Sequence, residues 1–265
     1  MKIYVCVKQV PDTSGKVAVN PDGTLNRASM QTITNPDDMN AVEAALKLKD
    51  ATGCKVTVVT MGPPPAAGML RELMAMGADE GVLVSAREFG GSDTYATSQI
   101  LAAALSTLGV EKDDIVMCGR QAIDGDTAQV GPQVAEDLDI PQVTYAWEVW
   151  PTEDGQHVRV KKELEEGFEI LEMACPCAVT VTKPDYEPRF PTIKSKMAAN
   201  KAKIPVLSAA DCGLDVERSG LKGSPTKVKK SFTPPRKEGG LKIKEETPEE
   251  SAKKLYDLLR DKGII

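Results

Sequence analysis

The sequence predicts an α/β protein with a doubly wound, mostly parallel sheet, an antiparallel extension and a long C-terminal arm that ends in a helix. Three observations support this fold class. Up to about residue 145, short apolar runs alternate with helical patterns, as in a parallel sheet covered by helices on both faces. Shorter strand-like runs follow, as in an antiparallel extension. Beyond about residue 183, Pro, Lys and Ser dominate until a capped apolar pattern appears near the C-terminus.

The strands are predicted from short apolar runs, which parallel sheets bury on both faces. The parallel strands are expected at 3–7, 56–61, 82–85, 115–118 and 143–150. Antiparallel strands are expected at 158–160, 168–173 and 178–181.

Helices are predicted between the strands. Asn35-Pro-Asp-Asp38 supplies an N-cap residue, a proline at the first helical position and acids in the first turn. Apolar patterns from Met69 and after Asp93 predict the next two helices. The connection before Asn35 is long for an α/β protein and contains a hairpin-like turn at 20–23, so we expect it to be a functional loop.

The segment Cys118 to Gln133, with the sequence CGRQAIDGDTAQVGPQ, lies between an apolar strand and a helix expected to begin at 127–130. In an open α/β sheet, ligands lie beyond the carboxyl ends of strands, where N–H groups at a helix start can hold phosphate. Asp124 and Asp126 would repel a phosphate unless they face backbone donors or a ribose hydroxyl. The segment predicts a nucleotide site, and an ordinary capped helix start is the alternative.

Composition excludes several classes of protein. The net charge of −6 and an aromatic content of 4% argue against nucleic-acid binding. The sequence shows no secretory signal and no apolar run near the roughly 20 residues that a membrane span needs, so we expect a cytoplasmic protein without membrane insertion. Cys175-Pro-Cys177 is compatible with a metal or redox pair, but buried structural thiols are favoured and no metal site is predicted. His157, the single histidine, is assigned no role.

The C-terminal part is expected to serve a partner. We divide the chain into a nucleotide-binding core (1–183), an extended partner-binding arm (184–244) and an amphipathic helix (245–265). Thr247-Pro-Glu-Glu250 is a capping box that precedes an apolar helical pattern. An arm without hydrophobic periodicity cannot fold alone and would either be disordered or lie along another protein. Together with the core and the terminal helix, it suggests an obligate partner. Packing of the helix back on its own domain is the alternative.

Taken together, these motifs resemble the beta subunit of electron-transfer flavoprotein over nearly the whole chain. The resemblance rests on the segments Val7–Asp12, Asn35–Asp38, Met61–Pro63, Gly119–Gly131, Val160–Glu169, Pro176 and Glu187–Ile193. It implies a heterodimer with an alpha subunit that carries FAD and exchanges electrons with an acyl-CoA dehydrogenase.

The resemblance also implies a cofactor in the beta subunit. In the electron-bifurcating branch this cofactor is a second FAD, reduced by NADH, with ferredoxin or flavodoxin as the low-potential acceptor. The loop with Gly125, Thr127 and Val130 resembles that branch. The alternatives are a non-bifurcating subunit with a structural AMP and a stand-alone nucleotide-binding protein.

The resemblance implies no catalytic acid or base, because the flavin carries the chemistry. It places phosphates against the backbone of 126–130 and adenine at the edge formed by Cys6 and Met61. The implied cofactor-binding residues are Cys6, Lys8, Val10, Asn35, Pro36, Asp37, Asp38, Met61, Gln121, Ala122, Ile123, Asp124, Gly125, Asp126, Thr127, Ala128, Gln129, Val130, Gly131 and Pro132.

Three further residues are implied in partner binding. Glu163 matches a family glutamate that positions the mobile flavin domain. Thr192 and Ile193 match the recognition loop, in which Ile193 is the aliphatic anchor and the lysines of 194–203 form its charged rim. Composition alone favours a solvated acidic turn and a surface linker at these places.

Overall fold

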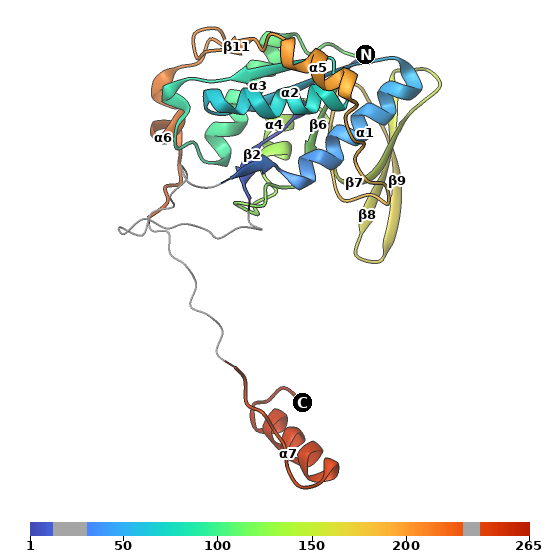
Figure 1. Cartoon of the computed structure of the whole chain (residues 1–265), viewed down its shortest axis with the longest axis vertical. Coiled ribbons are helices and arrows are strands. Elements are labelled where there is room, and N and C mark those ends of the chain that lie inside the picture. The colour runs from blue at the N-terminus through green and yellow to red at the C-terminus, as the bar shows by residue number, and fades with distance from the viewer. Residues whose placement is uncertain (13–30, 230–238) are drawn as a thin grey trace. The chain divides into compact units, whose positions relative to one another are not determined.

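A computed structural model describes residues 1–12, 31–229 and 239–265. The chain divides into two compact units, Met1–Lys229 and Lys230–Ile265. The first unit contains a nine-stranded sheet with the order β11-β5-β4-β1-β6-β10-β7-β8-β9. Figure 1 shows the long strands β7, β8 and β9 beside one another. The strands are β1 (Lys2–Cys6), β4 (Lys55–Met61), β5 (Glu80–Val84), β6 (Ile115–Gly119), β7 (Gln142–Pro151), β8 (His157–Leu164), β9 (Gly167–Ala174), β10 (Cys177–Val181) and β11 (Val206–Leu207).

The sheet is parallel from β11 to β7 and antiparallel from β7 to β9. The predicted fold class is therefore confirmed. A separate two-stranded sheet pairs β2 (Gln9–Pro11) with β3 (Thr32–Thr34). The expected turn at 20–23 lies outside the described residues.

The prediction that the strand at 178–181 is antiparallel was wrong. β10 lies between β6 and β7 and runs parallel to both. All five of its residues are buried. A continuously apolar strand of this kind is typical of a position covered on both faces, and it takes an antiparallel partner less often than an alternating strand does.

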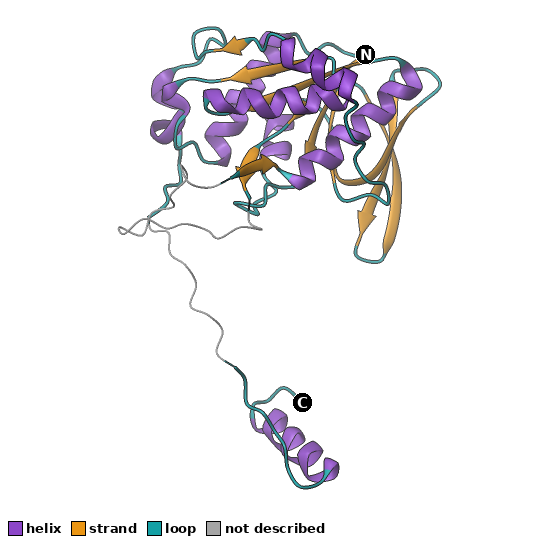
Figure 2. Cartoon of the chain, viewed as in Figure 1, coloured by secondary structure: helices purple, strands orange, loops and turns teal. Residues whose placement is uncertain are grey.

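Helices cover both faces of the sheet (Figure 2). On one face, α1 (Pro36–Thr52) and α2 (Ala67–Met76) share a buried cluster with the strands. On the other face, α3 (Thr94–Leu108) and α4 (Val130–Asp137) share a second cluster. Short 3₁₀ turns occupy η2 (Pro64–Ala66), η3 (Arg87–Phe89) and η4 (Val216–Arg218).

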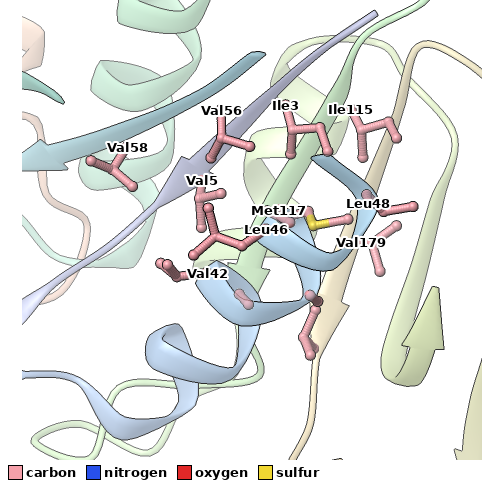
Figure 3. Packing of buried hydrophobic residues seen from close by; sticks show 14 of the residues in the cluster. Ile3, Val5, Val42, Leu46, Leu48, Val56, Val58, Ile115, Met117 and Val179 are labelled. Atoms are coloured by element: carbon pink, nitrogen blue, oxygen red, sulfur yellow. The ribbon is translucent and has the colours of Figure 1, made fainter. Parts of the chain in front are cut away.

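The core under α1 shows why this helix is fixed so firmly. Leu46 and Leu48 of α1 are essentially inaccessible to solvent, as are Ile3 and Met117 of the strands beneath them (Figure 3). Each such fully buried aliphatic side chain contributes about 1.5–3 kcal/mol relative to an exposed position. This packing holds α1 against the central strands of the sheet.

Residues 184–229, which belong to the segment that we assigned to a partner-binding arm, lie within the first compact unit. The backbone N–H groups of Leu83 and Ser85 in β5 donate to the carbonyls of Pro205 and Leu207, both at 2.9 Å, which adds β11 to the sheet. Helix α5 (Ile193–Lys201) packs on α2, and α6 (Gly220–Gly223) follows. Backbone pairing of a short edge strand needs no hydrophobic periodicity, so the sequence pattern did not reveal it.

The second unit contains α7 (Pro248–Asp261). The hydroxyl of Thr247 accepts a hydrogen bond from the Glu250 N–H, and the Glu250 carboxylate accepts one from the Thr247 N–H, which completes the predicted capping box. No residue of α7 is buried. Within the described parts of the chain, no helix is long and apolar enough to cross a membrane.

Candidate functional site

The candidate site lies at the topological switch point of the sheet, where successive connections from β1 lead to opposite sides. From β1 the chain moves to β4 and β5 on one side, and then returns to β6 on the other side of β1. Connections that diverge in this way leave a crevice beyond the carboxyl ends of the two central strands, where open α/β sheets bind ligands. Cys6 and Cys118 face each other in register at this end of β1 and β6. The segment Cys118 to Gln133, in which the sequence predicts a nucleotide site, therefore starts at this end of β6.

Asp38 ties three segments together at the crevice. Its Oδ2 accepts from the Lys8 N–H at 2.7 Å, and its Oδ1 accepts from the Gly119 N–H at 3.0 Å. Its carboxyl group is buried, which raises its pKa to about 7 although these two hydrogen bonds act in the opposite direction. A Cβ atom on Gly119 would lie 2.4 Å from the Asp37 carbonyl carbon, so only glycine allows this approach.

Asn35 has a different role from the predicted helix cap. It occupies the N-cap position of α1, but its side chain makes no capping hydrogen bond. Its Nδ2 instead donates to the Gln121 carbonyl at 2.7 Å, and its Oδ1 accepts from the Ile123 N–H at 3.1 Å. Asn35 is fully buried, so these contacts satisfy a side chain that has no access to water. The loop after β6 is thereby attached to the start of α1.

The two loop carboxylates turn toward side chains. Lys8 Nζ donates to both oxygens of Asp124, at 2.7 and 2.8 Å. Asp126 Oδ1 accepts from Gln121 Nε2 at 2.9 Å. Within the chain, the partners of the two carboxylates are thus an ammonium and a side-chain amide, and not the backbone donors that the sequence offered as one possibility. These contacts offset the repulsion that an anion in the crevice would otherwise meet.

The loop backbone itself carries several donors without a partner in the described part of the chain. Asp126 and Ala128 have left-handed φ values of 49° and 53°, an uncommon conformation for residues other than glycine. Within residues 1–12, 31–229 and 239–265, the N–H groups of Thr127, Ala128 and Gln129 have no hydrogen-bond partner. Successive free N–H groups in a turn that contains left-handed residues are the donors of an anion-binding nest. Helix α4 begins directly after them, at Val130.

The remaining predicted cofactor residues surround this loop with different degrees of exposure. Val10 is fully buried in β2, and Met61 ends β4 in a half-buried position. Gly131 lets α4 approach the sheet, because a Cβ atom there would lie 2.6 Å from Thr180 Cγ2. Gly125 has open space, with no atom within 4 Å of a Cβ built on it. The other predicted residues lie in the same loop or in the first turns of the two helices; they are Pro36, Asp37, Ala122 and Pro132.

Sequence reasoning missed Arg120. Its Nε lies 3.3 Å from Asp37 Oδ2, and its N–H donates to the Val181 carbonyl at 2.8 Å. Arg120 therefore connects β10, the loop and α1. The sequence contained a signal for this contact, since a basic residue in the loop can pair with the acidic residues in the first turn of α1.

The predicted partner-binding residues lie on separate elements. Glu163 is exposed on β8, in register with Phe168 of β9. The Thr192 hydroxyl accepts from the Ser195 N–H at 3.1 Å and caps α5. Ile193 begins α5 and is 83% exposed. The segment that we expected as a loop from Lys194 onward is thus a helix over most of its length.

Comparison with known proteins identifies the family. Residues 22–212 match the family model described as the electron transfer flavoprotein domain. The chain is 56% identical to the acryloyl-CoA reductase electron transfer subunit gamma of Anaerotignum propionicum, with both chains covered completely. It is 51% identical to the electron transfer flavoprotein subunit beta of Megasphaera elsdenii, with 100% of this chain and 98% of the other covered. It is 48% identical to the caffeyl-CoA reductase-Etf complex subunit CarD of Acetobacterium woodii, over the full length of both.

The match of the family model and these full-length identities agree with the resemblance seen in the loop, helix-start and C-terminal motifs. The chain therefore belongs to the electron transfer flavoprotein family, and its full-length relatives include a beta subunit of that family.

Proposed function

We propose that this chain is the beta subunit of a heterodimeric, electron-bifurcating electron transfer flavoprotein and that the crevice between β1 and β6 holds FAD. When bound, FAD supplies hydride acceptance from NADH and onward transfer of single electrons. The acceptors in this proposal are the alpha-subunit FAD, which serves an acyl-CoA dehydrogenase, and a ferredoxin or flavodoxin.

The single observation that carries the proposal is the nest of free N–H groups at Thr127, Ala128 and Gln129. It fits the phosphates of a dinucleotide, because such donors bind phosphate oxygens without a dedicated cation. The pairing of Lys8 with Asp124 and the anchoring of the loop by Asn35 hold these donors in place before a ligand arrives. The open side of Gly125 leaves room for the backbone to approach a ligand closely.

The names of the relatives support the assignment to a complex that acts on CoA thioesters. Two of the three full-length relatives above are named as subunits of acryloyl-CoA and caffeyl-CoA reductase complexes. All six cysteines of this chain are free thiols, which agrees with a reducing, cytoplasmic location. We assign no residue as a catalytic acid or base, because the protein here binds and orients the cofactor.

The deciding experiment is a count of cofactors. The chain would be co-expressed and purified with its alpha subunit, and the denatured complex separated by chromatography. The bifurcating assignment predicts about two FAD per heterodimer and bleaching of flavin absorbance by NADH. One FAD and one AMP per heterodimer would show a non-bifurcating subunit with a structural nucleotide.

A stand-alone nucleotide-binding protein is the candidate from another class. It predicts a stable, monodisperse assembly of this chain alone and no complex on co-expression. The unburied apolar residues of α7 favour the heterodimer instead. Size measurement of the chain, with and without the alpha subunit, separates the two.

A further inference from the structure

The connection between β9 and β10 carries two cysteines that the candidate cofactor site does not use. Cys175 follows the last residue of β9, and Cys177 begins β10. Their Sγ atoms are 4.0 Å apart, within hydrogen-bond distance for thiols. The pair lies at the amino end of β10. Because β10 runs parallel to β6, this is the end of the sheet opposite to the carboxyl ends of the strands, where the crevice lies.

The two thiols differ in access and in acidity. Cys175 is half-buried, whereas Cys177 is buried. The hydrogen bond with Cys177 lowers the pKa of the Cys175 thiol; His157 acts in the same direction, while burial, Asp113 and Asp114 oppose it. The same hydrogen bond, together with burial, raises the pKa of Cys177. Cys175 is thus the thiol that solvent reaches and that ionises first.

We propose that Cys175 and Cys177 form a redox-active dithiol, which a small-molecule disulfide converts to an intramolecular disulfide. A partly exposed, readily ionised thiol beside a second thiol is the arrangement found in redox-sensing cysteine pairs. The two Sγ atoms need to approach by about 2 Å to reach the S–S bond length of about 2.05 Å.

The reaction is an exchange of thiol and disulfide in two steps. The Cys175 thiolate attacks one sulfur of the reagent R–S–S–R, so that a mixed disulfide forms and R–S⁻ leaves and takes up a proton. The Cys177 sulfur attacks the Cys175 Sγ and expels the second R–S⁻, which takes up the proton that Cys177 releases. The protein loses two electrons and two protons, and the reagent gains them as two thiols.

The other cysteines provide controls within the same chain. Cys6 and Cys118 face each other, but both are buried, and their mutual hydrogen bond and burial raise the pKa of Cys118 well above its usual range. Cys212 is half-buried like Cys175, but burial raises the pKa of its thiol. We expect the buried pair to stay reduced and Cys212 to react slowly.

The test treats the full-length chain with bis(2-hydroxyethyl) disulfide, followed by an acid quench, alkylation and peptide mass spectrometry. We expect the peptide with both cysteines to lose about 2 Da, and Cys175 to react about tenfold faster than Cys212. Dithiothreitol should restore the original mass. Cys177→Ser should retain a mixed disulfide on Cys175, and Cys175→Ser should leave Cys177 reduced.

A lasting mixed disulfide on Cys175 of the unmodified sequence would overturn the proposal, because Cys177 would then have failed to close the bond. So would a bond from either cysteine to a different one, or a rate at Cys175 no greater than that at Cys212. The peptide map of the unmodified chain decides these outcomes even if a variant fails to fold. The inference does not rest on the proposed function.

Discussion

At the scale of single residues, the crevice depends on side chains that neutralise or restrain their neighbours. Lys8 pairs with Asp124, Gln121 with Asp126, and Asn35 with the backbone on both sides of Ala122. Each contact joins the loop to itself or to a neighbouring element. The carboxylates of the loop are therefore engaged by side chains, which leaves its backbone N–H groups available for the anion that we propose to bind there.

Gly125→Val tests the cofactor loop without disturbing the core. A Cβ atom at Gly125 meets no protein atom within 4 Å, so the free energy of unfolding should change by less than about 0.5 kcal/mol. If the cofactor approaches the loop there, its occupancy after purification should fall by about tenfold. Gly68→Val, at another glycine with open space, is the matched control and should keep full occupancy. Full occupancy in Gly125→Val would remove this residue from the site.

Asp38 predicts a pH dependence of stability. Its pKa is about 7 in the folded chain against its usual 3.8, because the carboxyl is buried. Between pH 3.8 and about 7, the folded state holds a proton on Asp38 that the unfolded state has released. The contribution of this proton to the free energy of unfolding is therefore complete below pH 3.8 and is lost as the pH rises through about 7.

Urea unfolding at about pH 5 and about pH 8 measures this effect, with an expected loss of about 1 kcal/mol or more at the higher pH. Asp38→Asn cannot titrate and should show a smaller loss. It should also be less stable by about 1–3 kcal/mol at low pH, because its amide group faces a backbone N–H donor. Equal pH dependence in both proteins would show that another group is responsible.

At the scale of elements, α1 holds the segment that precedes α5. Arg189 donates through Nε and Nη2 to the Glu43 carboxylate at 2.9–3.0 Å, and its Nη2 also donates to Asp50 at 2.7 Å. Lys47, which also belongs to α1, makes a cation–π contact with Tyr186, with its Nζ 3.7 Å from the centroid of the ring. The path of residues 184–192 is thus fixed by α1, and this places the exposed Ile193 at the start of α5.

Glu43→Gln should release this segment. The Glu43 side chain is only 7% exposed and that of Arg189 is 33% exposed, so loss of the charge should cost about 1–3 kcal/mol. Hydrogen exchange should accelerate in peptides from residues 184–201, as measured by mass spectrometry. Glu172→Gln breaks the ion pair with Arg159, whose side chains are 47% and 51% exposed, and should cost less than about 1 kcal/mol. Equal protection in both variants would argue against the role of Glu43.

At the scale of the whole molecule, the chain consists of two units with different requirements. The first unit buries two hydrophobic clusters on the two faces of its sheet. The second unit has a capped helix whose leucines remain at least partly exposed. A single amphipathic helix of this length gains most of its stability from packing against another surface. We expect the alpha subunit to supply that surface.

Leu255→Asp together with Leu259→Asp should weaken the heterodimer by about tenfold or more, because two apolar contacts are lost. The melting temperature of the first unit should not change. Lys253→Asp, at a position away from the apolar pattern, is the control and should bind the alpha subunit almost normally. Calorimetric titration would measure both affinities, and unchanged binding by the double variant would exclude α7 from the interface.

Much of the fold could be predicted because its signals are local. The proline and acids after Asn35 mark the start of α1, and the capping box at Thr247 marks the start of α7. The position of β10 and the addition of β11 could not be predicted, since strand neighbours are chosen by contacts between distant segments. The loop after β6 was recognised from its residues, but the partners of its carboxylates were not.

The sequence by itself determined the α/β fold class, the starts of α1 and α7, the family and the loop that borders the crevice. These follow from periodicity, caps and turn residues, which act between near neighbours. Only the tertiary structure decided that Lys8 meets Asp124 across 116 residues, that Asp38 joins Lys8 to Gly119, and that Arg189 is held by α1. Such contacts depend on how the elements pack, because hydrogen bonds and ion pairs require a geometry that no local pattern contains.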